Sequence, residues 1–142
     1  MPTVESERLL LDTHVWLWLV NGRPELDPSM AERIQAAGLG AGLYIQVFSV
    51  WEVAMLESKG RIQVSVGLEA WAEQALGLPG LRLVPLAPAI AIASTRLPGR
   101  LPSDPADRIL VATAREYSLT LVTRDAALLD YGRSGHLRVL AA

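Results

Sequence analysis

Short apolar segments alternate with helix-like segments along the whole chain, and this alternation limits the possible folds more than any other feature. Five runs are predicted as buried strands, at residues 9–11, 44–48, 81–84, 119–122 and 137–140. Helical spacing lies between them, at residues 13–20, 29–37, 49–59, 68–76, 87–97, 106–117 and 126–131. Strands that alternate with helices favour a parallel sheet with helices on both faces. We therefore predict an α/β fold, a three-layer α/β/α domain with a mostly parallel five-stranded sheet.

The length and composition limit the class of protein further. A chain of 142 residues without repeats or linkers is expected to form one domain over 1–142. It has no cysteine, so a metal ion would be bound by oxygen or histidine. No apolar run approaches the ~18 residues that cross a bilayer, and the N-terminal segment is acidic rather than a basic signal. We expect a soluble cytoplasmic protein that does not associate with membranes.

Four acidic residues fall where predicted strands end or helices begin. Asp12 ends the first strand and Glu52 sits in the first turn of the helix after the second. Asp107 opens the helix before the fourth strand, and Asp125 follows that strand. Because the carboxyl ends of parallel strands share one edge, where ligands bind at the switch in strand order, we expect these carboxylates to converge.

Helix capping is an alternative explanation for most of these acids. Ser49 and Glu52 have the spacing of a capping box, Asp104 stands before a proline as an N-cap, and Asp125 can cap the helix that follows it. A cap, however, accepts Ser, Thr or Asn as well as Asp, and capping requires no carboxylate at the end of a buried strand such as Asp12. The complete set of acids therefore favours a functional site.

Clustered carboxylates repel one another, and the repulsion is relieved either by raised pKa values or by a divalent cation. Oxygen ligands favour Mg²⁺ or Mn²⁺. A cation held in this way can polarise a phosphoryl oxygen, generate a nucleophile from bound water and orient an in-line displacement. It would also offset the acidic charge, so that a polyanion could approach a chain with a net charge of −2. This chemistry suits the hydrolysis of phosphodiester bonds.

Four segments resemble the motifs of the PIN domain family. They are LLLDT at 9–13, SVWEVA at 49–54, DPADRILVATA at 104–114 and LVTRD at 121–125. The match covers nearly the whole chain in the right order, and the DPADR run before an apolar helix is its most specific part. More narrowly, the chain is similar to VapC-type ribonuclease toxins.

The resemblance implies a Mg²⁺- or Mn²⁺-dependent endoribonuclease of a type II toxin–antitoxin system. Its catalytic and metal-binding acids correspond to the four residues described above, Asp12, Glu52, Asp107 and Asp125. The resemblance also implies a small antitoxin partner and a homodimer. Thr13 and Thr123 are candidates for contacts to the acids or to water at this site.

Other residues near the acids have two interpretations each. Asp104 either caps a helix or helps to order water at the metal. Arg108 either pairs with an acid or, like Arg124, is a candidate to contact RNA phosphates. Three more arginines are candidates to contact RNA phosphates, namely Arg96, Arg100 and Arg133. Ion pairs on the protein surface could equally explain them.

Aromatic residues of the first helix bear on partner binding. Trp16 and Trp18 lie about 200° apart around a helix, so one of them should face outward. An outward tryptophan suggests a surface groove for a partner peptide. His14 is expected to pack beside Trp18 rather than to point toward the metal.

Two other classes of function remain open at this point. One is a non-catalytic PIN-like domain that binds a partner. The other is an aspartyl-phosphate phosphatase or receiver domain, which also places acids after parallel strands. Such phosphatases carry a second Asp two positions after the first, where this chain has His14. Both groups use a well-placed lysine, whereas Lys59, the only lysine, stands at a helix end.

Overall fold

The central feature of the fold is a parallel sheet of five strands in the order β3-β2-β1-β4-β5. The computed structural model describes residues 7–64, 66–101 and 103–142. The strands are β1 (Leu9–Leu11), β2 (Leu43–Gln46), β3 (Leu81–Val84), β4 (Thr120–Thr123) and β5 (Val139–Ala141). The helices are α1 (Thr13–Val20), α2 (Pro28–Leu39), α3 (Val47–Ser58), α4 (Leu68–Leu76), α5 (Pro88–Ala93), α6 (Pro105–Tyr117) and α7 (Ala126–Arg133).

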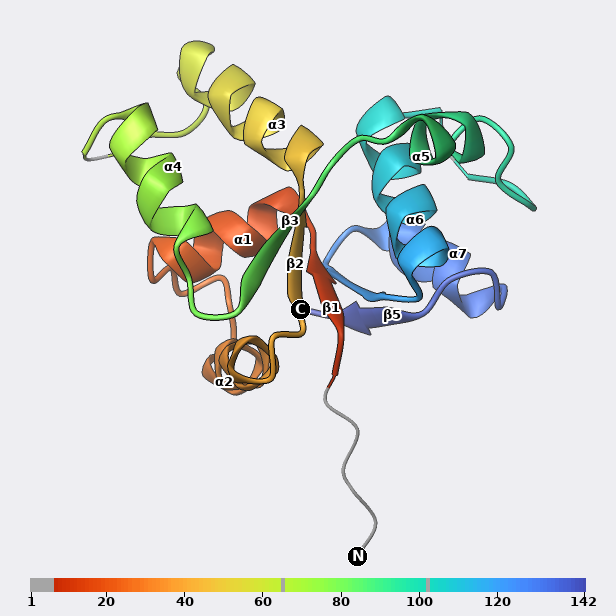
Figure 1. Cartoon of the computed structure of the whole chain (residues 1–142), viewed down its shortest axis with the longest axis horizontal. Coiled ribbons are helices and arrows are strands. Elements are labelled where there is room, and N and C mark those ends of the chain that lie inside the picture. Colours follow the sequence, from red (N-terminus) through yellow and green to blue (C-terminus); the bar gives the residue numbers. More distant parts are fainter. Residues whose placement is uncertain (1–6, 65, 102) are drawn as a thin grey trace, which may run out of the picture.

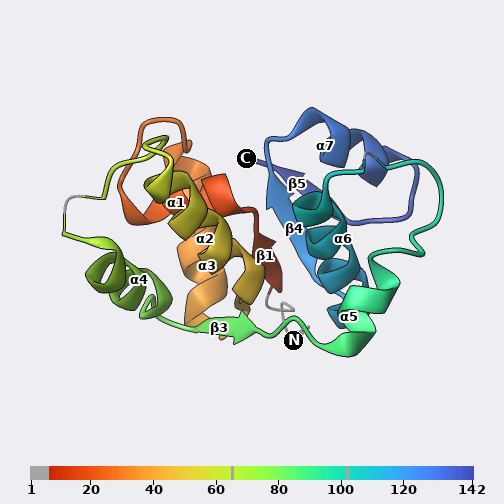
Figure 2. The same cartoon turned by 90° about the horizontal axis from the view of Figure 1, so that it is seen from above.

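Helices cover both faces of this sheet. Helices α1 to α4 lie on one side and α5 to α7 on the other, as the two perpendicular views show (Figures 1 and 2). Successive side chains of a strand point to opposite faces. Leu9 and Leu11 accordingly join the core under α1 to α4, whereas Leu10 joins the core under α5 to α7. Burial on both faces explains why the strands are continuous apolar runs, and the predicted α/β/α class is confirmed.

Two predicted boundaries are wrong. The strand expected at 44–48 ends at Gln46, because the following residues already belong to α3. The helix expected at 87–97 ends at Ala93, beyond which the chain continues in turns. The other predicted elements lie within a few residues of the observed ones, and helix α4 coincides with its predicted range.

The predicted capping box at Ser49 and Glu52 is also wrong. Helix α3 begins at Val47, and the side chain of Gln46 caps it by accepting a hydrogen bond from the backbone N–H of Phe48 at 3.1 Å. Ser49 is therefore a buried residue inside the first turn, and Glu52 lies in the second turn rather than the first. Neither the Ser49 nor the Glu52 side chain caps α3, so both can make other contacts.

The strand order reverses between β1 and β4, and this switch point defines one edge of the sheet. From β1 the chain runs outward to β2 and β3, then returns to β4 on the other side of β1. Leu11 pairs with Val122 across the two strands, and the backbone N–H of Asp12 donates to the carbonyl of Val122 at 3.0 Å. The residues after β1 and β4 are therefore adjacent at the position where parallel sheets bind ligands.

Candidate active site

Asp12 and Asp125 are linked at the switch point by the hydroxyl of Thr123. Thr123 is fully buried at the end of β4, and its Oγ1 donates to Asp12 Oδ2 at 2.7 Å. The same oxygen accepts the backbone N–H of Asp125 at 3.1 Å. Asp12 stands at the N-cap position of α1, but its side chain makes no capping hydrogen bond. Capping therefore does not explain this carboxylate.

Glu52 reaches the same edge from α3. Thr13 Oγ1 lies 2.6 Å from Glu52 Oε1, to which it donates, and 2.9 Å from Ser49 Oγ. Since a threonine hydroxyl carries one hydrogen, the Ser49 hydroxyl is the donor in the second contact. Sequence reasoning missed Ser49 as part of this site. The signal was present in its spacing, because residues three apart on a helix share a face.

Asp107 and Asp104 come from the start of α6. Asp104 is the N-cap of this helix, and its Oδ1 accepts the backbone N–H groups of Ala106 and Asp107 at 2.9 and 3.4 Å. The capping interpretation of Asp104 is thus confirmed. Asp107 lies in the first turn, half-buried, and is not a cap.

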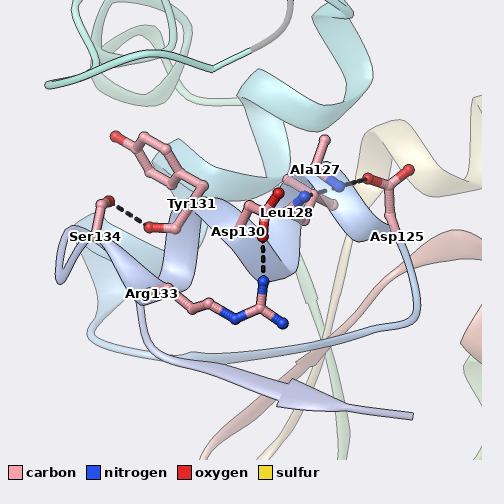
Figure 3. A network of polar contacts seen from close by, with 7 residues as sticks. All are labelled: Asp125, Ala127, Leu128, Asp130, Tyr131, Arg133 and Ser134. Atoms are coloured by element: carbon pink, nitrogen blue, oxygen red, sulfur yellow. Dashed lines mark hydrogen bonds and ion pairs between the residues drawn. The ribbon is translucent and has the colours of Figure 1, made fainter.

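Asp125 combines capping with a place in the acidic cluster. Its Oδ1 accepts the backbone N–H groups of Ala127 and Leu128, at 2.9 and 3.2 Å, at the start of α7. Figure 3 shows this oxygen bonded to the helix, while no bond is drawn to the other oxygen. Capping therefore accounts for one oxygen of this carboxylate.

The pKa values show that these carboxylates act on one another. The pKa of Asp107 is raised from 3.8 to about 7, first by burial and then by the charges of the neighbouring acids Asp104, Asp125, Asp12 and Glu52. Burial also raises the pKa of Asp12, against the hydrogen bond from Thr123. The pKa of Glu52 is raised by burial and, more weakly, by neighbouring acids, while its hydrogen bond from Thr13 lowers it. The acids thus share one electrostatic environment.

The acids face a common area without being drawn tightly together. Within residues 7–64, 66–101 and 103–142, no three Asp, Glu or His side chains lie close enough to enclose a metal ion as they stand. His14 is exposed, and its ring centroid lies 6.2 Å from that of Trp18, as expected from the sequence. Its charge nevertheless acts in the direction that lowers the pKa values of Asp12 and Glu52, so His14 also lies near the cluster.

The candidate arginines have specific structural partners. Arg108 is not paired with an acid among the described ion pairs, and it donates instead to the carbonyls of Ser94 and Leu101 at 2.8 and 3.3 Å. The guanidinium carbon of Arg124 lies 4.5 Å from the ring centroid of Trp18. Arg124 also donates to the carbonyls of Glu25 and Ala142.

The other three arginines lie on the surface. Arg133 pairs with Asp130 on α7, as Figure 3 shows. Arg96 and Arg100 are exposed in the segment between α5 and α6.

The two tryptophans of α1 face different environments, as their spacing predicts. Trp16 is fully buried, donates to the carbonyl of Ala75 at 3.3 Å and packs edge to face on Trp71 at 5.0 Å. Trp18 is partly exposed and lines a groove of about 1260 Å³ between α1, α4 and residues 60–64 and 66. The predicted outward tryptophan is therefore Trp18.

These features define an α/β/α domain that presents carboxylates at its switch point, a type of site that suits a divalent cation. The model of the PIN domain family matches residues 9–134, and the chain belongs to this family. Ribonuclease VapC22 of Mycobacterium tuberculosis is 33% identical over 123 residues, which cover 87% of this chain and 91% of that protein.

Lys59, exposed at the end of α3, gives the aspartyl-phosphate alternative no support.

Solved structures share this fold at low sequence identity. The VapBC2 complex of Rickettsia felis, bound to a DNA fragment from its promoter, contains a chain that matches with a TM-score of 0.69 and 14% identity. That match covers 94% of this chain and 97% of the other. DNA-bound VapBC of Salmonella typhimurium matches with a TM-score of 0.69 and 18% identity, over 95% of this chain and 98% of the other.

Proposed function

We propose that this chain, acting as one domain over residues 1–142, is a divalent-metal-dependent endoribonuclease and the toxin of a type II toxin–antitoxin pair. The observation that carries the proposal is the common electrostatic environment of Asp12, Glu52, Asp107 and Asp125 at the switch point. Identity to a protein named ribonuclease supports the activity. Structural likeness to VapBC complexes supports the biological role.

The donor set of this site fits Mg²⁺ or Mn²⁺. Carboxylates that raise one another's pKa values gain most from a bound cation, and carboxylate oxygen is the ligand that these ions prefer. Asp12, Glu52, Asp107 and Asp125 would hold the ion. When bound, such an ion polarises the phosphoryl oxygen and makes water a usable nucleophile at neutral pH.

The residues around the acids position them for this role. Thr13 and Thr123 each donate a hydrogen bond to a carboxylate, on Glu52 and Asp12 respectively, so both carboxylates are oriented before any ligand arrives. In the absence of a cation, Asp107 holds a proton over part of the neutral range because its pKa is about 7. Cation binding should therefore release a proton near neutral pH.

The test is RNA cleavage by the purified chain. We expect cleavage of a labelled RNA with Mg²⁺ or Mn²⁺ and none with a chelator. Asp12→Asn should lose at least about a hundredfold in rate while keeping its circular dichroism spectrum. The matched control is Asp130→Asn, an exposed carboxylate on α7 outside the cluster, which should cleave normally. Undiminished cleavage by Asp12→Asn would remove this residue from the mechanism.

The groove beside Trp18 is the proposed docking site for the antitoxin. Its lining combines an aromatic ring with charged groups, among them Arg23, Arg61 and Glu57. A small partner encoded by the adjacent gene should change the fluorescence of Trp18 and leave that of buried Trp16 unchanged. Single Trp→Phe variants separate the two signals, and a partner that binds without altering Trp18 emission would contradict this placement.

We also propose that the chain forms a homodimer. Large apolar side chains are exposed on α3, on β3, in the segment that leads into α5 and on α5 itself, namely Val47, Trp51, Leu83, Leu86 and Ile92. Figure 2 shows β3 and this segment running along one side of the molecule. Such exposed apolar residues are typical of an interaction surface.

The expected cellular location is part of this proposal. None of the helices in the described ranges has both the length and the apolar character needed to cross a membrane. Because the proposed substrate is RNA, we retain the cytoplasm as the predicted site of action.

A further inference from the structure

A second polar cavity lies on the edge of the sheet opposite to the acidic cluster. It has a volume of about 320 Å³ and lies between the end of α6 and the segment that enters β5; we call it the α6–β5 pocket. Its lining residues Ser118 and Arg138 stand just before β4 and β5, at the amino ends of these strands. The acids stand at the carboxyl ends, so the α6–β5 pocket is separate from the proposed active site.

Two arginines cross this pocket and hold its walls together. Arg115, on α6, donates to the carbonyl of His136 on the facing segment. Arg138 donates in the other direction, to the carbonyl of Ser118 at 3.0 Å. Each guanidinium has five N–H groups, and one of the five takes part in the bond described. Each of these two lining residues therefore keeps four N–H groups that the bond described does not use.

The positive charge of the pocket is not neutralised locally. Of the described residues that line it, none is acidic. The ion pairs found in the described part of the chain involve Arg23, Arg33 and Arg133 instead. Uncompensated guanidinium groups that share a cavity attract an anion.

Stabilisation of the α6 C-terminus explains part of this arrangement. Cations near a helix C-terminus bind its carbonyl groups, and Arg8 does so from outside the pocket, donating to the carbonyl of Tyr117 at 3.0 Å. That role accounts for the bond from Arg138 to Ser118, but it does not account for Arg115, whose bond goes to His136. An open wall remains at Gly135, where an added Cβ would meet no atom within 4 Å. The ring of His136 packs on Tyr131 at 5.5 Å, so we count it as a wall rather than a ligand.

We propose that the α6–β5 pocket binds a phosphate group, carried either by a nucleotide or by a nucleic-acid chain. The planar fork of arginine matches phosphate through two parallel hydrogen bonds, and two forks on facing walls can grip one group from both sides. The volume is at the small end of ligand pockets, which suits a phosphate with little of the molecule attached to it. The site requires no metal ion and does not depend on the activity proposed above.

The experiment measures backbone amide chemical shifts of the wild-type chain in a buffer that contains a chelator, which prevents cleavage. The probes are inorganic phosphate, adenosine monophosphate and a short oligoribonucleotide, each compared with sodium chloride at equal ionic strength. We expect saturable shifts at Ser118, Leu119 and Gly135. A nucleotide ligand would bind at least as tightly as the oligoribonucleotide, whereas a nucleic-acid chain would bind about tenfold more tightly than the nucleotide, because a second phosphate can reach Arg8.

Variants test whether the two forks cause the binding. Arg115→Gln combined with Arg138→Gln should weaken it by at least about tenfold. Arg82→Gln, an exposed arginine on β3, is the matched control and should leave it unchanged. If the double variant does not fold, Arg115→Lys with Arg138→Lys keeps the charge but removes the forks and should still weaken binding. Shifts that match those in sodium chloride, or binding that survives loss of both forks, would overturn the proposal.

Discussion

Asp107→Asn tests how much the charge of Asp107, half-buried among other acids, destabilises the folded chain. The pKa of Asp107 is raised from 3.8 to about 7, first by burial and then by neighbouring acids. At ~1.4 kcal/mol for each pH unit, this displacement corresponds to ~4 kcal/mol of unfolding free energy. Since the carboxyl group is only half-buried, solvent screening reduces the cost to about 2 kcal/mol. Asparagine has nearly the same shape and carries no charge. The free energy of unfolding of the variant should therefore exceed that of the wild type by this amount.

The pH dependence follows from the direction of the pKa shift. Between pH 3.8 and about 7, the folded chain keeps a proton on Asp107 that the unfolded chain releases. The free energy of unfolding therefore falls as the pH rises through this window, and the full cost is present above it. Without a metal, Asp107→Asn should exceed the wild type by about 2 kcal/mol at pH ~8 and approach it at pH ~4.

The assay is urea unfolding followed by circular dichroism across this pH range, with a chelator present. Glu116→Gln, at an exposed position of the same helix, is the control and should follow the wild-type curve. Added Mg²⁺ should reverse the order, because an ion at a hundred times its dissociation constant stabilises the wild type by about 2.7 kcal/mol and an impaired site by less. If the curves of Asp107→Asn and the wild type stay parallel from pH ~5 to ~8, the pKa of Asp107 is not raised in the folded chain and the reasoning fails.

Three further changes probe the support of the site, the fold and the assembly. Thr123→Val removes the hydroxyl bonded to Asp12 and should cost about 2 kcal/mol and slow RNA cleavage; an unchanged melting curve and rate would contradict the role given to this bond. Gly80→Ala should prevent folding, because the backbone φ is +74° and the new Cβ would lie 1.6 Å from the carbonyl oxygen of Gly38; a soluble variant with a native spectrum would refute this. Trp51→Glu places a charge on the exposed apolar surface and should give a monomer in size-exclusion chromatography, whereas a dimer would move the interface elsewhere.

The parts of the site that could be predicted are those that local sequence determines. A carboxylate directly after a buried apolar run has no simple structural role, and this marked Asp12 before any contact was known. Asp104 was recognisable as a cap because a proline follows it at the first helical position. Parallel strands place the residues after β1 and β4 on the same edge of the sheet, whereas the pairing of these two strands is a finding of the structure.

The parts that could not be predicted depend on contacts between distant segments. Helix α3 begins at Val47, two residues before the predicted start, because Gln46 supplies the cap. Glutamine is not among the usual capping residues. Arg108 binds the carbonyls of Ser94 and Leu101 in loops whose paths no local pattern specifies. Its position next to Asp107 in sequence therefore suggested an ion pair that the fold does not form.

The four acids are held in place by two different means, and the difference bears on the proposed binding of a metal ion. Asp12 and Asp125 follow adjacent strands and share the Thr123 hydroxyl, so the sheet itself fixes their spacing. Glu52 and Asp107 depend on how α3 and α6 are placed at the end of β2. Gln46 connects these two helices, because its Oε1 caps α3 while its Nε2 donates to Thr113 Oγ1 on α6 at 2.9 Å. We predict that the proposed ion would draw Glu52 and Asp107 toward Asp12 and Asp125 through small movements of α3 and α6 about this buried side chain.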